Sequence, residues 1–139
     1  MREVTMEARI DNLPRMFDVL INELRKYGVD ASIIKQCKLC AEEVFMNISC
    51  YAYKPGTGDV TMKIDTKTEE HKLDLRMIFS DSGKPFNPLL TGRPDLDSDL
   101  EHRKIGGLGI YLVKSTMDSV QYDRIDSRNI LTLKKILDI

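Results

Sequence analysis

Apolar and polar residues alternate along several short stretches of the chain, and a period of two is typical of β-strands with one buried face. The strands are expected near residues 4–10, 60–64, 73–79, 120–125 and 129–137. In the first of them Ile10 is expected on the buried face, and a polar turn near 67–70 is expected to join the second strand to the third. The pattern therefore predicts a sheet of five strands.

Apolar residues spaced three and four apart predict three helices. The first begins near Pro14, which is tolerated early in a helix because its missing N–H has no partner there, and ends at Gly28. The second runs from Asp30 or Ser32 to about Tyr51, before the Pro and Gly residues of a turn at 54–58. The third opens on the glycines of 106–109, and its expected buried positions are Ile110, Leu112, Val113 and Met117.

The order of these elements is strand, helix, helix, strand, strand, long loop, helix, strand, strand. It predicts an α+β fold, a two-layer α/β sandwich in which a mixed, mostly antiparallel sheet carries the helices on one face. No repeat or linker divides the 139 residues, so a single domain over 1–139 is expected. The loop at 82–104 is long for a compact domain, and such loops are usually functional or disordered.

Composition and charge narrow the classes of function. The chain has 21 Lys and Arg residues against 22 Asp and Glu, a formal net charge of -1, which argues against a general polyanion binder. The first residues lack the apolar core of a signal peptide, and no apolar run is long enough to span a membrane. A cytoplasmic location is therefore expected.

Three cysteines, Cys37, Cys40 and Cys50, are an odd number and do not make a disulfide framework. The spacing of Cys37 and Cys40 leaves metal or redox chemistry open, but a second pair of ligands is missing. The favoured interpretation is that these thiols fill the core beside a helix.

Glu43 and Asn47 are the first pair of candidate functional residues. An apolar stripe on the second helix is formed by Cys37, Cys40, Val44, Ile48 and Tyr51. At about 100° per residue Asn47 falls at the edge of this stripe, Glu43 lies one turn earlier, and Glu42 points toward water. A solvated helix flank is the alternative interpretation of Glu43.

Asp81 is the second candidate, because it shares the strand parity of Leu73, Leu75, Met77 and Phe79 and so extends their buried face. A buried carboxylate is costly unless a donor bonds to it, and the exocyclic amino group of a bound base is such a donor. Gly83 then lets the backbone approach a ligand closely. The alternative is an Asp that caps the turn after its own strand.

The glycines of 106–109 are the third candidate. Glycines at a helix N-terminus expose backbone N–H groups to phosphate oxygens, and His102, Arg103 and Lys104 add positive charge just before them. The spacing fits neither the dinucleotide-binding fingerprint nor a P-loop, and a loop hinge is the alternative. Taken together, the three candidates can enclose one nucleotide, with a Mg²⁺ ion on its phosphates and the loop as a lid.

Three motifs in this order resemble those of the GHKL, or Bergerat-fold, ATP-binding superfamily. More narrowly, the chain resembles the anti-sigma-factor serine-protein kinases of the sporulation and general-stress type. Residues 41–53 resemble the N box of the family, 81–88 its first glycine box and 106–113 its second. The resemblance thus covers nearly the whole chain and implies a histidine-kinase-like ATPase domain with an ATP lid at about 84–105.

The resemblance also implies a role for each matched residue. Glu43 is expected as the general base for the attacking hydroxyl, Asn47 as the Mg²⁺ ligand and Asp81 as the adenine contact, with Gly83 as its supporting turn. The other implied ATP-binding residues are Arg103, Lys104, Gly106, Gly107, Leu108, Gly109 and Asn129. The chain departs from the family pattern at Tyr51, where many relatives have a basic residue, and at Asn129, where a Thr is usual. Parity with Leu131 and Leu133 nevertheless directs Asn129 inward.

The main hypothesis is an ATP-binding anti-sigma factor with serine/threonine-protein kinase activity, which uses ATP and Mg²⁺ to phosphorylate a small anti-anti-sigma protein. Its expected partners are that antagonist and a sigma factor, with a possible homodimer and no direct contact with nucleic acid or membrane. The alternative is a non-catalytic module that sequesters a sigma factor or other regulator in an ATP-dependent manner. The catalytic half of a histidine kinase is disfavoured, because no further helical hairpin with a phosphoaccepting His fits in 139 residues.

Overall fold

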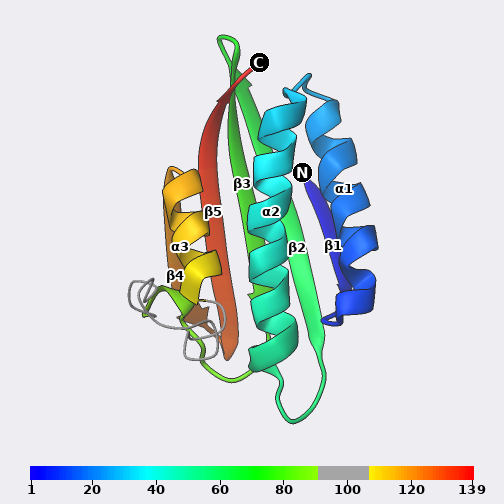
Figure 1. Cartoon of the computed structure of the whole chain (residues 1–139), viewed down its shortest axis with the longest axis vertical. Helices are drawn as coiled ribbons and strands as arrows, with labels where there is room; N and C mark the ends of the chain where they lie inside the picture. The colour runs from blue at the N-terminus through cyan, green and yellow to red at the C-terminus, as the bar shows by residue number, and fades with distance from the viewer. Residues whose placement is uncertain (91–106) are drawn as a thin grey trace.

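The computed structural model describes residues 1–90 and 107–139. Figure 1 shows two layers, with the helices packed on one face of the sheet. In chain order the main elements are β1 (Arg2–Glu7), α1 (Leu13–Arg25), α2 (Ala31–Asn47), β2 (Asp59–Glu69), β3 (Lys72–Asp81), α3 (Gly107–Thr116), β4 (Ser119–Ile125) and β5 (Arg128–Asp138). Short helical turns occur at η1 (Ile10–Asn12), η2 (Ile48–Ala52) and η3 (Pro88–Leu90). The expected two-layer α+β sandwich is confirmed.

The sheet has the strand order β1-β2-β3-β5-β4, and all four of these pairings between the described strands are antiparallel. Its register aligns residues that are far apart in the sequence. Asp81 at the end of β3 lies opposite Asn129 of β5, and Asn129 lies opposite Arg124 of β4. These three residues therefore form one row across three strands.

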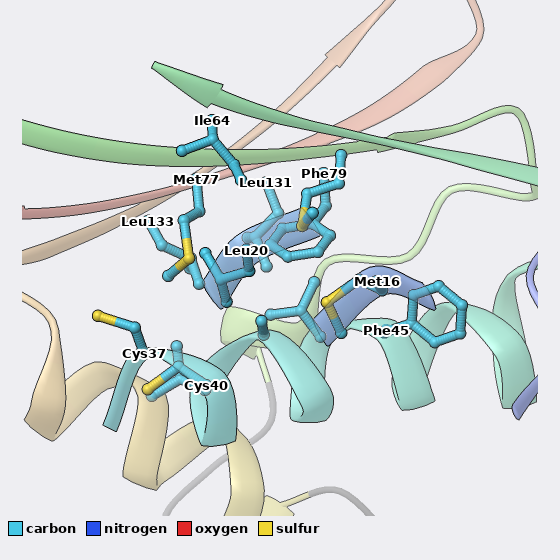
Figure 2. Packing of buried hydrophobic residues seen from close by; sticks show 14 of the residues in the cluster. Met16, Leu20, Cys37, Cys40, Phe45, Ile64, Met77, Phe79, Leu131 and Leu133 are labelled. Atoms are coloured by element: carbon cyan, nitrogen blue, oxygen red, sulfur yellow. The ribbon is translucent and has the colours of Figure 1, made fainter. Parts of the chain in front are cut away.

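The core lies between the sheet and the helices. Figure 2 shows Met16 and Leu20 of α1 and the thiols of α2 facing side chains of the sheet, among them Met77 and Leu133. Alternate residues of β3 point inward because successive side chains of a strand face opposite ways, and this parity places Asp81 inward as well. Cys37 and Cys40 are buried in this core, which confirms that they pack there as apolar side chains.

Two residues expected in the core are exposed. β1 ends at Glu7 because the chain turns there: the Asn12 side chain donates to the Glu7 carbonyl, and Ile10 lies in η1 on the surface. Leu112 is exposed because α3 packs on the sheet through Ile110 and Val113, which leaves the other side of this helix to solvent. The predicted inward positions of Ile10 and Leu112 are therefore wrong.

The turns between neighbouring strands are tighter than expected. β2 continues to Glu69, and the turn predicted at 67–70 is confined to Glu70 and His71, with φ of 45° and 66°. Asp126 and Ser127 join β4 to β5 with φ of 51° and 63°. Two successive residues with positive φ define the type I′ hairpin turn, whose right-handed twist suits antiparallel strands.

The second helix does not run unbroken to Tyr51. The α-helix ends at Asn47 and continues as the wider π-helical turn η2. The C-terminal end of α2, the N-terminal end of α3, the end of β3 and the start of β5 all lie at the same end of the molecule (Figure 1). Every described candidate residue belongs to these four ends or lies next to one of them.

Candidate functional site

A largely apolar pocket opens at this end of the sheet. Its walls include Val44 and Asn47 of α2, Phe79 and Asp81 of β3, Asn129 of β5 and Phe86 of the following loop. It encloses about 320 Å³ of space, including its open mouth. Apolar walls with a few convergent polar groups are typical of sites for small organic ligands.

Asp81 is the carboxylate of this pocket and is only 3% exposed. Its Oδ1 atom accepts hydrogen bonds from the Gly83 N–H and from Asn129 Nδ2, each at 2.9 Å. The bond from Gly83 is the turn cap that was considered as the alternative role for Asp81. Since both bonds use the same oxygen, the cap does not exclude a ligand at Oδ2, which has no hydrogen-bond donor within the described ranges.

Asn129 lies beside Asp81 and is 5% exposed, so its expected inward direction is confirmed. Its Nδ2 atom donates to Asp81 and, at 2.8 Å, to the Lys84 carbonyl. Its Oδ1 atom accepts from the Tyr122 hydroxyl, from Arg124 Nη1 and, at 3.3 Å, from the Phe86 N–H. Parity puts Tyr122 and Arg124 on one face of their strand, but the register that places Arg124 opposite Asn129 and Tyr122 opposite Leu131 depends on the length of the turn, and the sequence interpretation missed both.

Glu43 and Asn47 lie one turn apart on α2. The Glu43 carboxylate lies against Gly109 of α3, and Asn47 is part of the pocket wall. Asn47 lines the pocket at 7% exposure, and its amide has no hydrogen-bond partner among residues 1–90 and 107–139. Glu43 is half-buried; burial raises the pKa of its carboxyl, and the nearby Glu42 raises that pKa further. A carboxyl with a raised pKa suits a general base. Glu42 is itself half-buried, although it was expected to point into water.

Two glycines allow close contacts around these side chains. A Cβ atom at Gly109 would overlap the Glu43 carboxylate, and one at Gly83 would overlap the Ala52 carbonyl. The Lys84 N–H donates to that same carbonyl at 3.0 Å, so the end of α2 is joined to the turn after β3. The glycines thus bring α3 and the 83–84 backbone against the two ends of the candidate site.

Comparison with known proteins identifies the family. Residues 6–135 match the family model described as "Histidine kinase-like ATPase domain". The chain belongs to this family. The GHKL-type resemblance inferred from the motifs at 41–53, 81–88 and 106–113 is thereby confirmed, and membership of the histidine kinase-like ATPase family supports ATP as the ligand of the pocket.

Individual relatives in this family are protein kinases by name. The chain is 27% identical to the serine-protein kinase RsbW of Bacillus mycoides over 107 residues, which are 74% of the chain and 64% of the relative. It is 30% identical to the serine/threonine-protein kinase BtrW of Bordetella bronchiseptica over 95 residues, which are 68% of the chain and 65% of the relative. The match therefore spans slightly less than two thirds of the length of these relatives.

The residues of the site suit the ligands of an ATPase domain. An apolar pocket with one buried carboxylate suits a base that carries an amino group, and the backbone N–H groups at the start of α3 can donate to phosphate oxygens. The Asn47 amide oxygen is the kind of ligand that Mg²⁺ takes together with phosphate oxygens. Gly107, Leu108 and Gly109 form the first turn of α3, as expected of the second glycine box.

Other members of the expected phosphate site lie outside the described residues. These are Arg103, Lys104, Gly106 and most of the expected lid. Within the part of the chain that is described, no group of three or more His, Cys, Asp or Glu side chains is arranged to hold a metal ion. The helices in that part are also too short or too polar to cross a bilayer.

A contact between Tyr51 and the pocket residue Phe86 was also missed. The rings of Tyr51 and Phe86 lie 5.8 Å apart, and the Lys54 ammonium lies 5.8 Å from the Tyr51 ring centroid. A positive charge is therefore present next to Tyr51. The Tyr53 hydroxyl accepts from the Ser82 N–H at 2.8 Å and donates to the Asp59 carbonyl, which fixes the turn after η2 to the end of β3.

Proposed function

We propose that the chain is an ATP-binding anti-sigma factor with serine/threonine-protein kinase activity, whose substrate is a small anti-anti-sigma protein. One observation carries the proposal: the half-buried Glu43 and the pocket-lining Asn47 lie one turn apart on α2, between the start of α3 and the pocket that contains Asp81. The kinase names of the relatives support the reaction class. The resemblance of the motifs to those of the anti-sigma kinases supports the choice of partners.

Each residue has one task in this reaction. Asp81 accepts a hydrogen bond from the amino group of adenine, and the backbone N–H groups at the start of α3 bind phosphate oxygens. Asn47 holds the Mg²⁺ ion, which neutralises charge on the phosphates when it is bound. Glu43 takes the proton from the attacking Ser or Thr hydroxyl. The bond between that oxygen and the γ-phosphorus forms, and the bond from this phosphorus to the oxygen of the departing ADP breaks.

The raised pKa of Glu43 supports its task. A carboxyl whose pKa is raised by burial is a stronger base than an ordinary glutamate. Lys54 supplies a positive charge near the phosphates in place of a basic residue at position 51. Contributions of Arg103 and Lys104, a homodimer and a cytoplasmic location remain predictions.

A phosphorylation assay with Mg-ATP and candidate antagonist proteins tests the proposal. We expect the wild-type chain to label the antagonist and Glu43→Ala to abolish labelling while it retains ATP binding. Glu42→Ala is the matched control, because it removes the adjacent carboxylate of the same helix and should leave labelling intact. Equal labelling by wild type and Glu43→Ala would exclude Glu43 as the base.

The non-catalytic alternative gives a different result in the same experiment. A module of that kind binds ATP, retains a sigma factor in a pull-down and transfers no phosphate to any antagonist. Failure of the wild-type chain to bind ATP, measured as a thermal shift with and without Mg²⁺, would contradict both functions.

A further inference from the structure

Arg124, Asn129 and Asp81 form a hydrogen-bonded chain that runs from the protein surface to the pocket. They lie opposite one another on β4, β5 and β3. Arg124 is exposed, and its Nη1 atom donates to Asn129 Oδ1 at 3.1 Å and to the Gly83 carbonyl at 2.8 Å. Asn129 in turn donates to Asp81. A surface cation is thus connected to the carboxylate of the pocket through one amide.

The amide of Asn129 can point in only one direction. The Arg124 guanidinium can only donate and the Lys84 carbonyl can only accept, so the amide oxygen faces Arg124 and the amide nitrogen faces Lys84 and Asp81. The Tyr122 hydroxyl and the Phe86 N–H also donate to the oxygen. The second hydrogen of Nδ2 goes to the Lys84 carbonyl. Both hydrogens and both lone pairs of the amide are therefore used by the protein, and none is left for a ligand.

This arrangement also fixes the rotation of the Asp81 carboxylate. Its Oδ1 atom is held by two donors, Asn129 Nδ2 and the Gly83 N–H. Rotation about χ2 would break both bonds, so Oδ2 keeps one position in the pocket. A fixed acceptor discriminates among purine bases by the group at position 6. A 6-amino group can donate a hydrogen bond to Asp81 Oδ2, whereas a 6-oxo group would place a second acceptor oxygen against Oδ2.

We propose that Asn129, oriented by Arg124 and Tyr122, is a positioning residue that gives the pocket its selectivity for a 6-aminopurine nucleotide. Asn129 acts through Asp81 and not on the base itself. The inference rests on the proposed function in one respect, namely that the pocket binds a purine nucleotide. It goes beyond that function by assigning the selectivity to the hydrogen bonds that residues of β4 and β5 make behind Asp81.

The test compares three nucleotides that differ at position 6 of the purine: ATP, inosine triphosphate and purine riboside triphosphate, which has only hydrogen there. Their dissociation constants are measured with the full chain. Arg124→Met is the informative variant, because the side chain is exposed and its loss leaves the core intact. We expect it to lower the preference for ATP over purine riboside triphosphate by about tenfold, the effect of about one well-placed hydrogen bond. Tyr122→Phe should lower the preference by a smaller factor.

Arg128→Met is the matched control. Arg128 belongs to the same hairpin, but its guanidinium donates to the hydroxyls of Ser80 and Ser82 and not to Asn129. This variant should keep the wild-type preference. In a chain that carries Asp81→Asn, Arg124→Met should have no further effect on the preference, because the acceptor that it positions is gone.

A purely structural role for Arg124 predicts a different pattern. Arg124→Met would then weaken all three nucleotides by the same factor or lower the unfolding temperature alone, and either result overturns the inference while nucleotide binding by the wild type stands. A wild-type chain that binds none of the three nucleotides would overturn the proposed function and the inference together.

Discussion

The Glu43 carboxylate lies directly against the α-carbon of Gly109, in the space that a side chain at position 109 would occupy. Glu43 is on α2 and Gly109 is in the first turn of α3, so the contact joins two helices at the candidate site. The sequence interpretation placed Gly109 in a phosphate loop. The structure adds a steric requirement, since residue 109 must lack a side chain for Glu43 to keep its position.

We therefore expect Gly109→Ala to slow phosphoryl transfer at least about tenfold while ATP affinity changes little. Alanine is favoured over glycine inside a helix by about 1 kcal/mol, so the helix itself should not suffer. Its methyl group would instead push the carboxylate away from the attacking hydroxyl, and small displacements of a catalytic group are costly to the rate. Transfer rates and nucleotide titrations on the same preparation separate the two effects.

Gly56→Ala is the control for this substitution. A Cβ atom there would lie 3.4 Å from the Tyr53 carbonyl oxygen, an ordinary contact, and the variant should transfer phosphate like the wild type. If Gly109→Ala also keeps the wild-type rate, phosphoryl transfer does not require the Glu43 carboxylate to lie against Gly109.

The raised pKa of Glu43 makes both activity and stability depend on pH. Glu43 must be ionised to act as a base, so transfer should fall on acidification at a higher pH than an ordinary glutamate would give. Glu42→Gln removes the smaller cause of the raised pKa, the neighbouring negative charge. The pH at which transfer is half-maximal, the midpoint of the profile, should therefore be lower in this variant. An unchanged midpoint in Glu42→Gln would contradict the assignment of the midpoint to Glu43.

The raised pKa of Glu43 changes the folding stability with pH in the opposite direction to a salt-bridged carboxylate, whose pKa is lowered. The folded state holds the Glu43 proton more tightly than the unfolded state, so the contribution of this group is present below its ordinary pKa and is lost as pH rises through the raised pKa. Glu43→Gln carries no charge to bury. It should unfold at a higher temperature than the wild type above the raised pKa and at the same temperature below the ordinary one, which thermal unfolding from about pH 4 to about pH 8 measures.

Much of the fold was predictable because one face of each central strand is buried. Strand parity alone predicted that Asp81 and Asn129 point inward, and both do. Helix periodicity likewise placed Glu43 and Asn47 one turn apart at the border of the core. These predictions succeed because the period of a strand or helix depends only on local backbone geometry.

The network behind Asp81 was not predictable in the same way. It depends on which residue of β4 faces Asn129, and that register is set by a two-residue turn at Asp126 and Ser127. These residues are not the Asn-Gly pair that signals such a turn, and a turn one residue longer would place different side chains opposite Asn129. The contact between Glu43 and Gly109 is likewise a matter of helix packing, which no local pattern contains.

The three cysteines should differ in reactivity according to their burial. Burial raises the pKa of the Cys37 thiol to about 12 and also raises the pKa of Cys40, so neither forms a reactive thiolate at neutral pH. Cys50 is only half-buried in η2. We expect a thiol reagent to label one cysteine per folded chain and three per unfolded chain, with Cys50→Ser removing the folded-state label. Rapid labelling of Cys37 in the folded chain would contradict its place in the core.

The hairpin between β2 and β3 offers a test of backbone strain far from the candidate site. His71 has φ of 66°, a left-handed conformation that disfavours residues with a Cβ atom by roughly 1–2 kcal/mol, and its carbonyl accepts the Ile139 N–H, which glycine would preserve. After the extra flexibility of glycine in the unfolded chain is subtracted, His71→Gly should stabilise the fold by roughly 0.5–1 kcal/mol and raise the unfolding temperature by about 2–4 °C.

Gly28→Ala is the converse variant and should have the opposite effect. Gly28 has φ of 69°, and nothing lies within 4 Å of the place where a Cβ atom would stand, so alanine adds conformational strain without a steric clash. We expect it to destabilise the chain by about 1 kcal/mol. Thermal unfolding of both variants beside the wild type measures the pair. Shifts of the same sign in the two variants would mean that positive φ does not determine the effect, because it is the feature that the two positions share.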